Sequence, residues 1–169
     1  MKNEFTALDI FKALKIPRER LRAWTKLGFI TPTVPAAGQG IKAVFTIQDV
    51  YGVALFRSLI DAGFGRAGAG DWVNQFLKRT KGEPDHQKTK YILFKTRKEK
   101  DKTVASVITL ADGQWLLDLK SGGICPGWFP SAVNEGITQL TSKGEGWDSF
   151  YIVNFKTLQE DVEKALLKL

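Results

Sequence analysis

Long cationic side chains recur at a regular spacing near the N-terminus, where Arg18, Arg22 and Lys26 are four residues apart and Arg20 lies among them. In an α-helix, residues four apart share one face, so this spacing predicts a single row of positive charge. Guanidinium and ammonium groups in such a row can reach phosphate oxygens and guanine edges of duplex DNA. An ordinary solvated face of a surface helix has the same pattern, so the row alone does not decide between the two.

The opposite side of the same segment is apolar at a spacing of three, with Leu21, Trp24 and Leu27. We expect a helix over about residues 18–27 that packs on the core through these side chains. A first helix, with Thr6 as its N-cap, precedes it and ends at the Ile16-Pro17 break. Two short helices joined by a tight turn, the second of them basic, have the layout of a helix-turn-helix.

A small hairpin is expected after the basic helix, because two prolines favour an extended chain at residues 29–35. Residues 36–40 form a glycine-containing tip, and residues 41–45 return as a short strand. Such a hairpin would serve as a DNA-binding wing. Its expected contacts are Gln39 at the tip and Lys42 on the returning strand.

The length of 169 residues fits two small domains. The first, at residues 1–82, is expected to be mainly helical, with Thr46 capping a third helix and a fourth helix over about residues 67–81. Residues 83–89 are expected to form a linker. Residues 90–169 are expected to form a small α+β domain.

An antiparallel sheet with a closing helix is the expected structure of the second domain. Its expected strands cover residues 90–96, 103–110, 114–120 and 149–155. The charged stretch 97–102 is interpreted as a turn or loop, and 121–148 as mostly irregular, with a short helix near 131–139 as one option. Thr157 and Glu160 would form a capping box at the start of the closing helix. The fold class is therefore α+β, a helical winged helix-turn-helix domain followed by a small sheet domain.

Positive charge is concentrated in the first half of the chain. Residues 1–82 contain 13 Lys and Arg against 6 Asp and Glu, whereas residues 103–169 contain 5 against 8. This asymmetry predicts a polyanionic partner for the first domain and a different task for the second.

Catalytic and metal chemistry have little support in the composition. Cys125 is the only cysteine and His86 the only histidine, so these residue types provide neither a disulfide within the chain nor a metal cage. Neither a Ser-His-Asp arrangement nor a nucleotide-binding fingerprint is visible. We therefore expect no enzyme activity and no cofactor. The lack of a long apolar run or a signal-peptide pattern favours a cytoplasmic protein without a membrane partner.

Several short stretches occur in a specific order: Phe5-Thr6, Ile16-Pro17, Leu21-Arg22-Ala23-Trp24, Leu27-Gly28-Phe29-Ile30-Thr31-Pro32, Phe45-Thr46-Ile47-Gln48-Asp49-Val50 and Ala62-Gly63-Phe64. In this order they resemble the winged helix-turn-helix domain of the MerR family of transcription regulators. The resemblance implies that Arg22 and Trp24 are backbone and groove contacts of a recognition helix, and that Lys42 is the wing cation. The chain departs from the family at Ala23, where an aromatic residue is usual, and at Phe45, which lacks the family's tyrosine hydroxyl.

The resulting interpretation is a sequence-specific DNA-binding transcription regulator, whose partner is double-stranded DNA. Its expected DNA-binding residues are Arg18, Arg20, Arg22, Trp24, Lys26, Gln39 and Lys42. One alternative is an excisionase-like architectural protein of phage or recombination systems, which uses the same domain. Another is a protein-interaction or ligand-binding module with an incidentally basic N-terminus. A steep salt dependence of DNA binding would favour the DNA-binding alternatives.

A homodimer is expected, although the long helix through which MerR proteins pair does not follow residue 80. The candidate dimer contact is an apolar stripe in the last helix, formed by Leu158, Val162, Leu166 and Leu169. We expect this stripe to be shared between two copies, because one short exposed helix is marginally stable by itself. The acidic second domain is also the expected place for a small-molecule or protein effector.

Overall fold

The computed structural model describes residues 4–36, 38, 41–80, 89–99, 102–111, 116–118, 124–125 and 149–169. The chain divides into two compact units. The helical unit comprises Met1–Glu83 and Thr157–Leu169, and the sheet unit comprises Pro84–Lys156. The sheet unit is therefore inserted into the chain of the helical unit. The last helix, which the sequence placed in the second domain, belongs to the helical unit from Thr157 onward.

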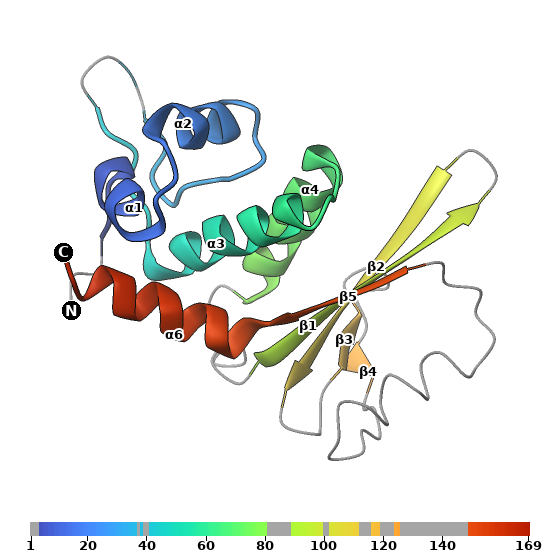
Figure 1. Ribbon diagram of the computed structural model, residues 1–169. Helices are drawn as coiled ribbons and strands as arrows, with labels where there is room; N and C mark the ends of the chain where they lie inside the picture. Colours follow the sequence, from blue (N-terminus) through green and yellow to red (C-terminus); the bar gives the residue numbers. More distant parts are fainter. Residues whose placement is uncertain are drawn as a thin grey trace. The chain divides into compact units, whose positions relative to one another are not determined.

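The helices follow the expected order along the chain (Figure 1). They are α1 (Ala7–Leu14), α2 (Arg18–Lys26), α3 (Ile47–Asp61), α4 (Arg66–Thr80) and α6 (Phe155–Leu166). Capping boxes begin α1 and α3, since the hydroxyls of Thr6 and Thr46 each accept the N–H of the aspartate three residues later at 3.3 Å. The predicted mainly helical N-terminal region is confirmed.

The core of the helical unit is centred on α3, whose buried apolar residues are Val50, Val53, Leu55, Phe56 and Leu59. Ile10 of α1 and Leu21 of α2 are buried in the same unit, each at most 1% exposed. α4 packs closely on α3, because a Cβ atom added at Gly52 would lie 2.5 Å from Cδ1 of Leu77. Burial of such side chains, about 1.5–3 kcal/mol each, stabilises the short helices that contribute them.

The segment between α2 and α3 forms a hairpin through single bridges rather than through the expected short strand. Val34 and Val44 exchange backbone hydrogen bonds of 3.1 and 2.9 Å. Phe45 pairs in the same way with Phe5. The ladder cannot extend from Val34 toward α2, because Pro32 has no N–H to donate. We call residues 33–45 the wing; residues 37, 39 and 40 lie outside the described chain.

The strands of the sheet unit form a five-stranded sheet in the order β4-β3-β2-β1-β5. They are β1 (Thr89–Glu99), β2 (Lys102–Ala111), β3 (Leu116–Asp118), β4 (Ile124–Cys125) and β5 (Ser149–Asn154), and neighbouring strands are antiparallel. Tyr91 of β1 lies opposite Asn154 of β5. The chain therefore enters and leaves this unit on neighbouring strands.

One expectation for this part of the chain was wrong. Residues 97–99 and Lys102 belong to paired strands rather than to a turn or loop, and Glu99 lies opposite Lys102, a register of opposite charges that favours strand pairing. β4 lies within the stretch expected to be mostly irregular, and the rest of that stretch lies outside the described residues. The expected helix near 131–139 and His86 lie outside the described residues.

The last helix also differs from expectation. α6 begins at Phe155, two residues before the expected N-cap, and Phe155 is 1% exposed, so its burial favours a direct passage from strand to helix. Val162 and Leu166 are 2% and 9% exposed within a single chain. Two of the four residues expected to form a dimer contact are therefore packed inside the chain. Leu158 is half-buried and Leu169 is exposed.

A polar contact links α6 to α3 within the helical unit. The Tyr51 hydroxyl donates a hydrogen bond to Oε1 of Glu163, and Figure 1 shows the two helices side by side. α6 thus completes the helical unit from the far end of the chain. None of the helices in the described residues combines the length and the apolar character needed to cross a membrane.

Candidate nucleic-acid interface

The two faces of α2 have opposite character. Leu21 and Trp24 are 1% and 5% exposed and point into the core. Arg18, Arg22 and Lys26 are exposed, as the four-residue spacing predicted, and so is Arg20. Ala23 and one carboxylate, Glu19 in the first turn, are also exposed on α2. Leu27, expected on the apolar face, is 63% exposed because it occupies the C-cap position, where the chain leaves the helix.

The cations of α2 are available to an external anion. None of the four forms an ion pair with a carboxylate in the described part of the chain. Arg20 has an aromatic neighbour instead, since its guanidinium carbon lies 5.8 Å from the centre of the Trp24 ring. A row of exposed positive charge of this kind attracts a polyanion over the range of a Debye length.

Trp24 is a core residue and not the groove contact that the MerR resemblance implies. Its ring meets Phe56 of α3 edge-on, with centroids 4.9 Å apart and an interplanar angle of 73°. Phe56 also stacks on Phe29, with centroids 5.9 Å apart. Such pairs contribute about 0.5–1.5 kcal/mol each beyond burial. The aromatic cluster therefore attaches α2 firmly to α3.

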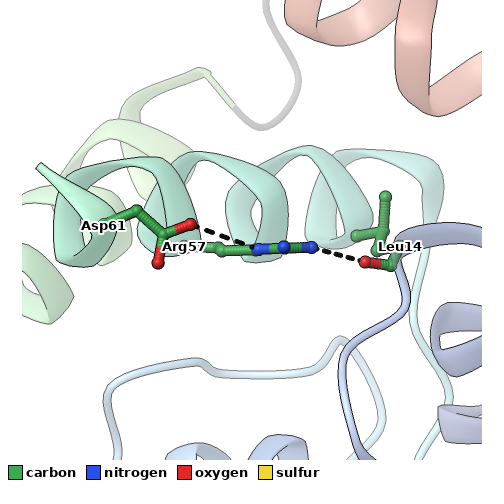
Figure 2. A network of polar contacts seen from close by, with 3 residues as sticks. All are labelled: Leu14, Arg57 and Asp61. Carbon is green, nitrogen blue, oxygen red and sulfur yellow. Dashed lines mark hydrogen bonds and ion pairs between the residues drawn. The ribbon is translucent and has the colours of Figure 1, made fainter.

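The turn that enters α2 is attached to α3 by Arg57. Its Nη1 donates to the carbonyl oxygen of Leu14, and its Nε lies 3.4 Å from Oδ2 of Asp61 (Figure 2). Leu14 is the last residue of α1, where carbonyls lack a partner within their own helix. Arg57 therefore fixes the end of α1, and with it the start of α2.

The turn that leaves α2 is attached to α4. Nδ2 of Asn74 donates to the carbonyl oxygen of Gly28 at 2.9 Å. Gly28 has a φ of 74°, a left-handed conformation that glycine adopts without strain. A Cβ atom at Gly70 would lie 2.9 Å from Cα of Phe29, so the close approach of α4 to this turn requires a glycine.

Lys15 adopts a left-handed conformation in the turn between α1 and α2, with φ 56° and ψ 30°. Lys15 is the only non-glycine residue with a positive φ among the described residues. This conformation costs an L-residue about 1–2 kcal/mol. Glycine would therefore adopt the backbone conformation at position 15 at a lower energetic cost than the exposed lysine. Lys15 lies directly before the cations of α2.

The base of the wing is attached to α3 by Asp49, which is 0% exposed. Its Oδ2 accepts the N–H of Thr46 at 2.9 Å and the N–H of Thr33 at 2.8 Å. One carboxylate thus joins the start of α3 to the first residue of the wing. Lys42 is exposed on the returning arm, and Gln39 lies outside the described residues.

The sequence predicted the exposed cations of this surface but missed the residues that position them. The bonds made by Asp49, Arg57 and Asn74 join residues 16, 43 and 46 positions apart in the chain. No local spacing indicates such pairs. The one local signal was the position of Asp49 three residues after Thr46, and it indicated a helix start rather than a contact with the wing.

No group of three or more His, Cys, Asp or Glu side chains in the described residues is arranged to hold a metal ion. A comparison with models of known families and with curated proteins found no match to this chain. The candidate interface therefore rests on the geometry of the chain itself.

Proposed function

We propose that the helical unit binds duplex DNA through the exposed face of α2, as a sequence-specific, MerR-like regulator of transcription. The observation that supports this proposal most is that α2 combines exposed cations with a fixed position in the helical unit. α2 exposes four cations without an ion-pair partner in the described chain, while α3 and α4 fix the turns at both of its ends. A helix fixed in this way can enter a major groove without reorganising.

Each contact has a defined role in this arrangement. Arg18, Arg22 and Lys26 reach guanine edges and phosphates from within the major groove. Lys15 in the preceding turn and Lys42 on the wing reach flanking phosphates, which set the register of the protein on the duplex. Trp24 and Arg57 act indirectly, because they position α2 rather than touch DNA.

Arg22→Ala in the full chain tests the proposal. On a duplex selected from random DNA by the wild-type chain, we expect a loss of about 1–3 kcal/mol, or roughly 5- to 150-fold in affinity. The free energy of unfolding should change by less than about 0.5 kcal/mol, because Arg22 is exposed.

Lys164→Ala is the matched control, since it removes one exposed cation from α6. Tyr51 and Phe56 are five residues apart in α3, so α6 and α2 contact α3 at directions roughly 140° apart. The control variant should bind within about twofold of wild type. Equal losses in the two variants would attribute binding to net charge and contradict the proposal.

A second candidate function is that of an excisionase-like architectural protein. The burial of Val162 and Leu166 within one chain favours it, because the expected dimer contact is thereby occupied. Sites selected from random DNA discriminate between the two. Inverted half-sites one helical turn apart indicate a dimeric regulator, whereas single or directly repeated sites indicate the architectural protein.

The sheet unit keeps its predicted role as the place for an effector or partner. Its chain connections lead to α4 and α6, and both of these helices contact α3. α3 in turn positions α2 and the wing.

A further inference from the structure

The β1–β2 pair extends beyond the other described strands of the sheet unit (Figure 1). β1 is paired with β2 up to Glu99, but with β5 only up to Thr96. β2 pairs with β3 only from Ile108 onward. Among the described strands, residues 97–99 and 102–104 therefore pair only with each other. We call these two segments the ribbon end.

The amino-acid composition changes where the neighbouring strands stop. Within the sheet β1 has the sequence Ile92-Leu93-Phe94, and Ile92 is 0% exposed. The ribbon end has the sequences Arg97-Lys98-Glu99 and Lys102-Thr103-Val104, with one apolar residue. A two-stranded ribbon without an apolar face is marginally stable in water. Its extension past the sheet therefore contributes little to the core of the unit.

The charges of the ribbon end are not balanced by its own pairing. It contains three cations and one carboxylate, which gives a net charge of +2. Glu99 lies opposite Lys102, whereas Arg97 lies opposite Val104 and Lys98 opposite Thr103. Arg97 and Lys98 thus have no carboxylate in register with them on β2, and the described part of β5 ends opposite Thr96.

We propose that the ribbon end binds the phosphate backbone of duplex DNA, as a second contact in addition to α2. A pair of antiparallel strands has the right width to lie against a DNA groove. Cations at its tip would displace counterions from the phosphates. The inference rests on the proposed function, because DNA is favoured over an acidic protein by the separate row of cations on the helical unit.

The test compares full-length variants by salt titration of DNA binding. Arg97→Gln with Lys98→Gln removes both charges and keeps side chains of similar length. On a selected site with flanking duplex on both sides, the slope of log K against log salt should become shallower by about 1–2. Lys164→Ala with Lys168→Ala is the control that matches the charge of this double variant.

Arg97→Lys with Lys98→Arg preserves both charges and should restore the wild-type slope. An unchanged slope in the Gln variant on the flanked duplex would overturn the inference, while the dependence on Arg22 would still support the interface on α2. A wild-type chain whose binding does not depend on Arg22 would overturn the proposed function instead. Urea unfolding of each variant identifies any change in DNA binding that is caused by misfolding. If the Gln variant is destabilised, the slope of the charge-preserving variant decides whether charge at these two positions contributes to DNA binding.

Discussion

α1 and α3 begin with the same motif, a threonine followed three residues later by an aspartate. The two aspartates differ in burial and in the segments to which they hydrogen-bond. Asp9 is half-buried, and its Oδ2 accepts the N–H and the hydroxyl of Thr6 at 2.7 and 2.8 Å. Asp49 is fully buried and also accepts the N–H of Thr33, 16 residues earlier in the chain. The first box forms a helix start, whereas the second also attaches the wing.

α3 and α1 also differ in how many of their side chains bind other segments of the chain. α3 contributes three polar side chains that each contact another segment: Asp49 the wing, Tyr51 helix α6 and Arg57 the end of α1. The end of α1 is attached by α3, because the carbonyl oxygen of Leu14 accepts a hydrogen bond from Arg57. In both helices the local motif determines where the helix begins, whereas the buried position of Asp49 allows it to attach the wing as well.

Among the variants considered, Asp49→Ala should lower the free energy of unfolding most. It removes the N3 carboxylate of the capping box, which accepts the N–H of Thr46, and the acceptor for Thr33. We therefore expect the free energy of unfolding in urea to fall by about 2–3 kcal/mol. DNA affinity should fall as well, because the wing loses its attachment. Asp9→Ala is the matched change at α1, with an expected loss of about 1 kcal/mol and unchanged affinity for DNA where the protein is folded. Equal effects of the two variants would contradict the assigned difference.

Tyr51→Phe tests the link between α3 and α6, and should lower the free energy of unfolding by about 1–2 kcal/mol at neutral pH. Burial of the phenol raises the pKa of Tyr51 above its ordinary value of 10.0, and the hydrogen bond and charge of Glu163 raise it further. The hydroxyl therefore remains a donor in the folded protein at neutral pH.

The pH dependence of this link has a definite sign. Because the pKa is raised on folding, the contribution of Tyr51 is fully present below about pH 10 and is lost as the pH rises toward the folded-state pKa. The difference in stability between wild type and Tyr51→Phe should therefore shrink above pH 10. A difference that stays constant across that range would show that the hydroxyl does not stabilise the folded state as a donor.

Lys15→Gly should have the smallest effect on folding and the opposite sign. Glycine avoids the cost of the left-handed conformation but loses more backbone entropy, so we expect a gain of about 0.5–1 kcal/mol in thermal or urea unfolding. DNA binding should weaken, because the turn before α2 loses a cation. A variant that is both more stable and equally strong in DNA binding would remove Lys15 from the interface.

Local signals in the sequence were sufficient for the helices of the first 80 residues. Thr6 and Thr46 indicated the starts of α1 and α3, and the spacing of Leu21 and Trp24 indicated the buried face of α2. Each of these signals acts within one or two helical turns. Periodicity failed at Leu27, where the helix ends and the side chain turns outward.

The remaining features depend on contacts between distant parts of the chain. Tyr51 and Glu163 are 112 residues apart, so no local pattern indicated that the last helix completes the helical unit. Arg97 and Lys98 resembled turn residues because their charge is atypical of a strand, and only the register with β2 shows otherwise. In the second case the pairing of the strands overrides local propensity.

Salt titration of DNA binding by the wild-type chain and Arg22→Ala tests the central claim most directly. If α2 and the wing neutralise several phosphates, log K should fall steeply with log salt, with a slope of about −3 to −5. Arg22→Ala should bind more weakly at every salt concentration, with a slope shallower by up to about 1 and an unchanged free energy of unfolding. A flat slope for the wild type, or coincident titrations for the two proteins, would contradict DNA binding by α2.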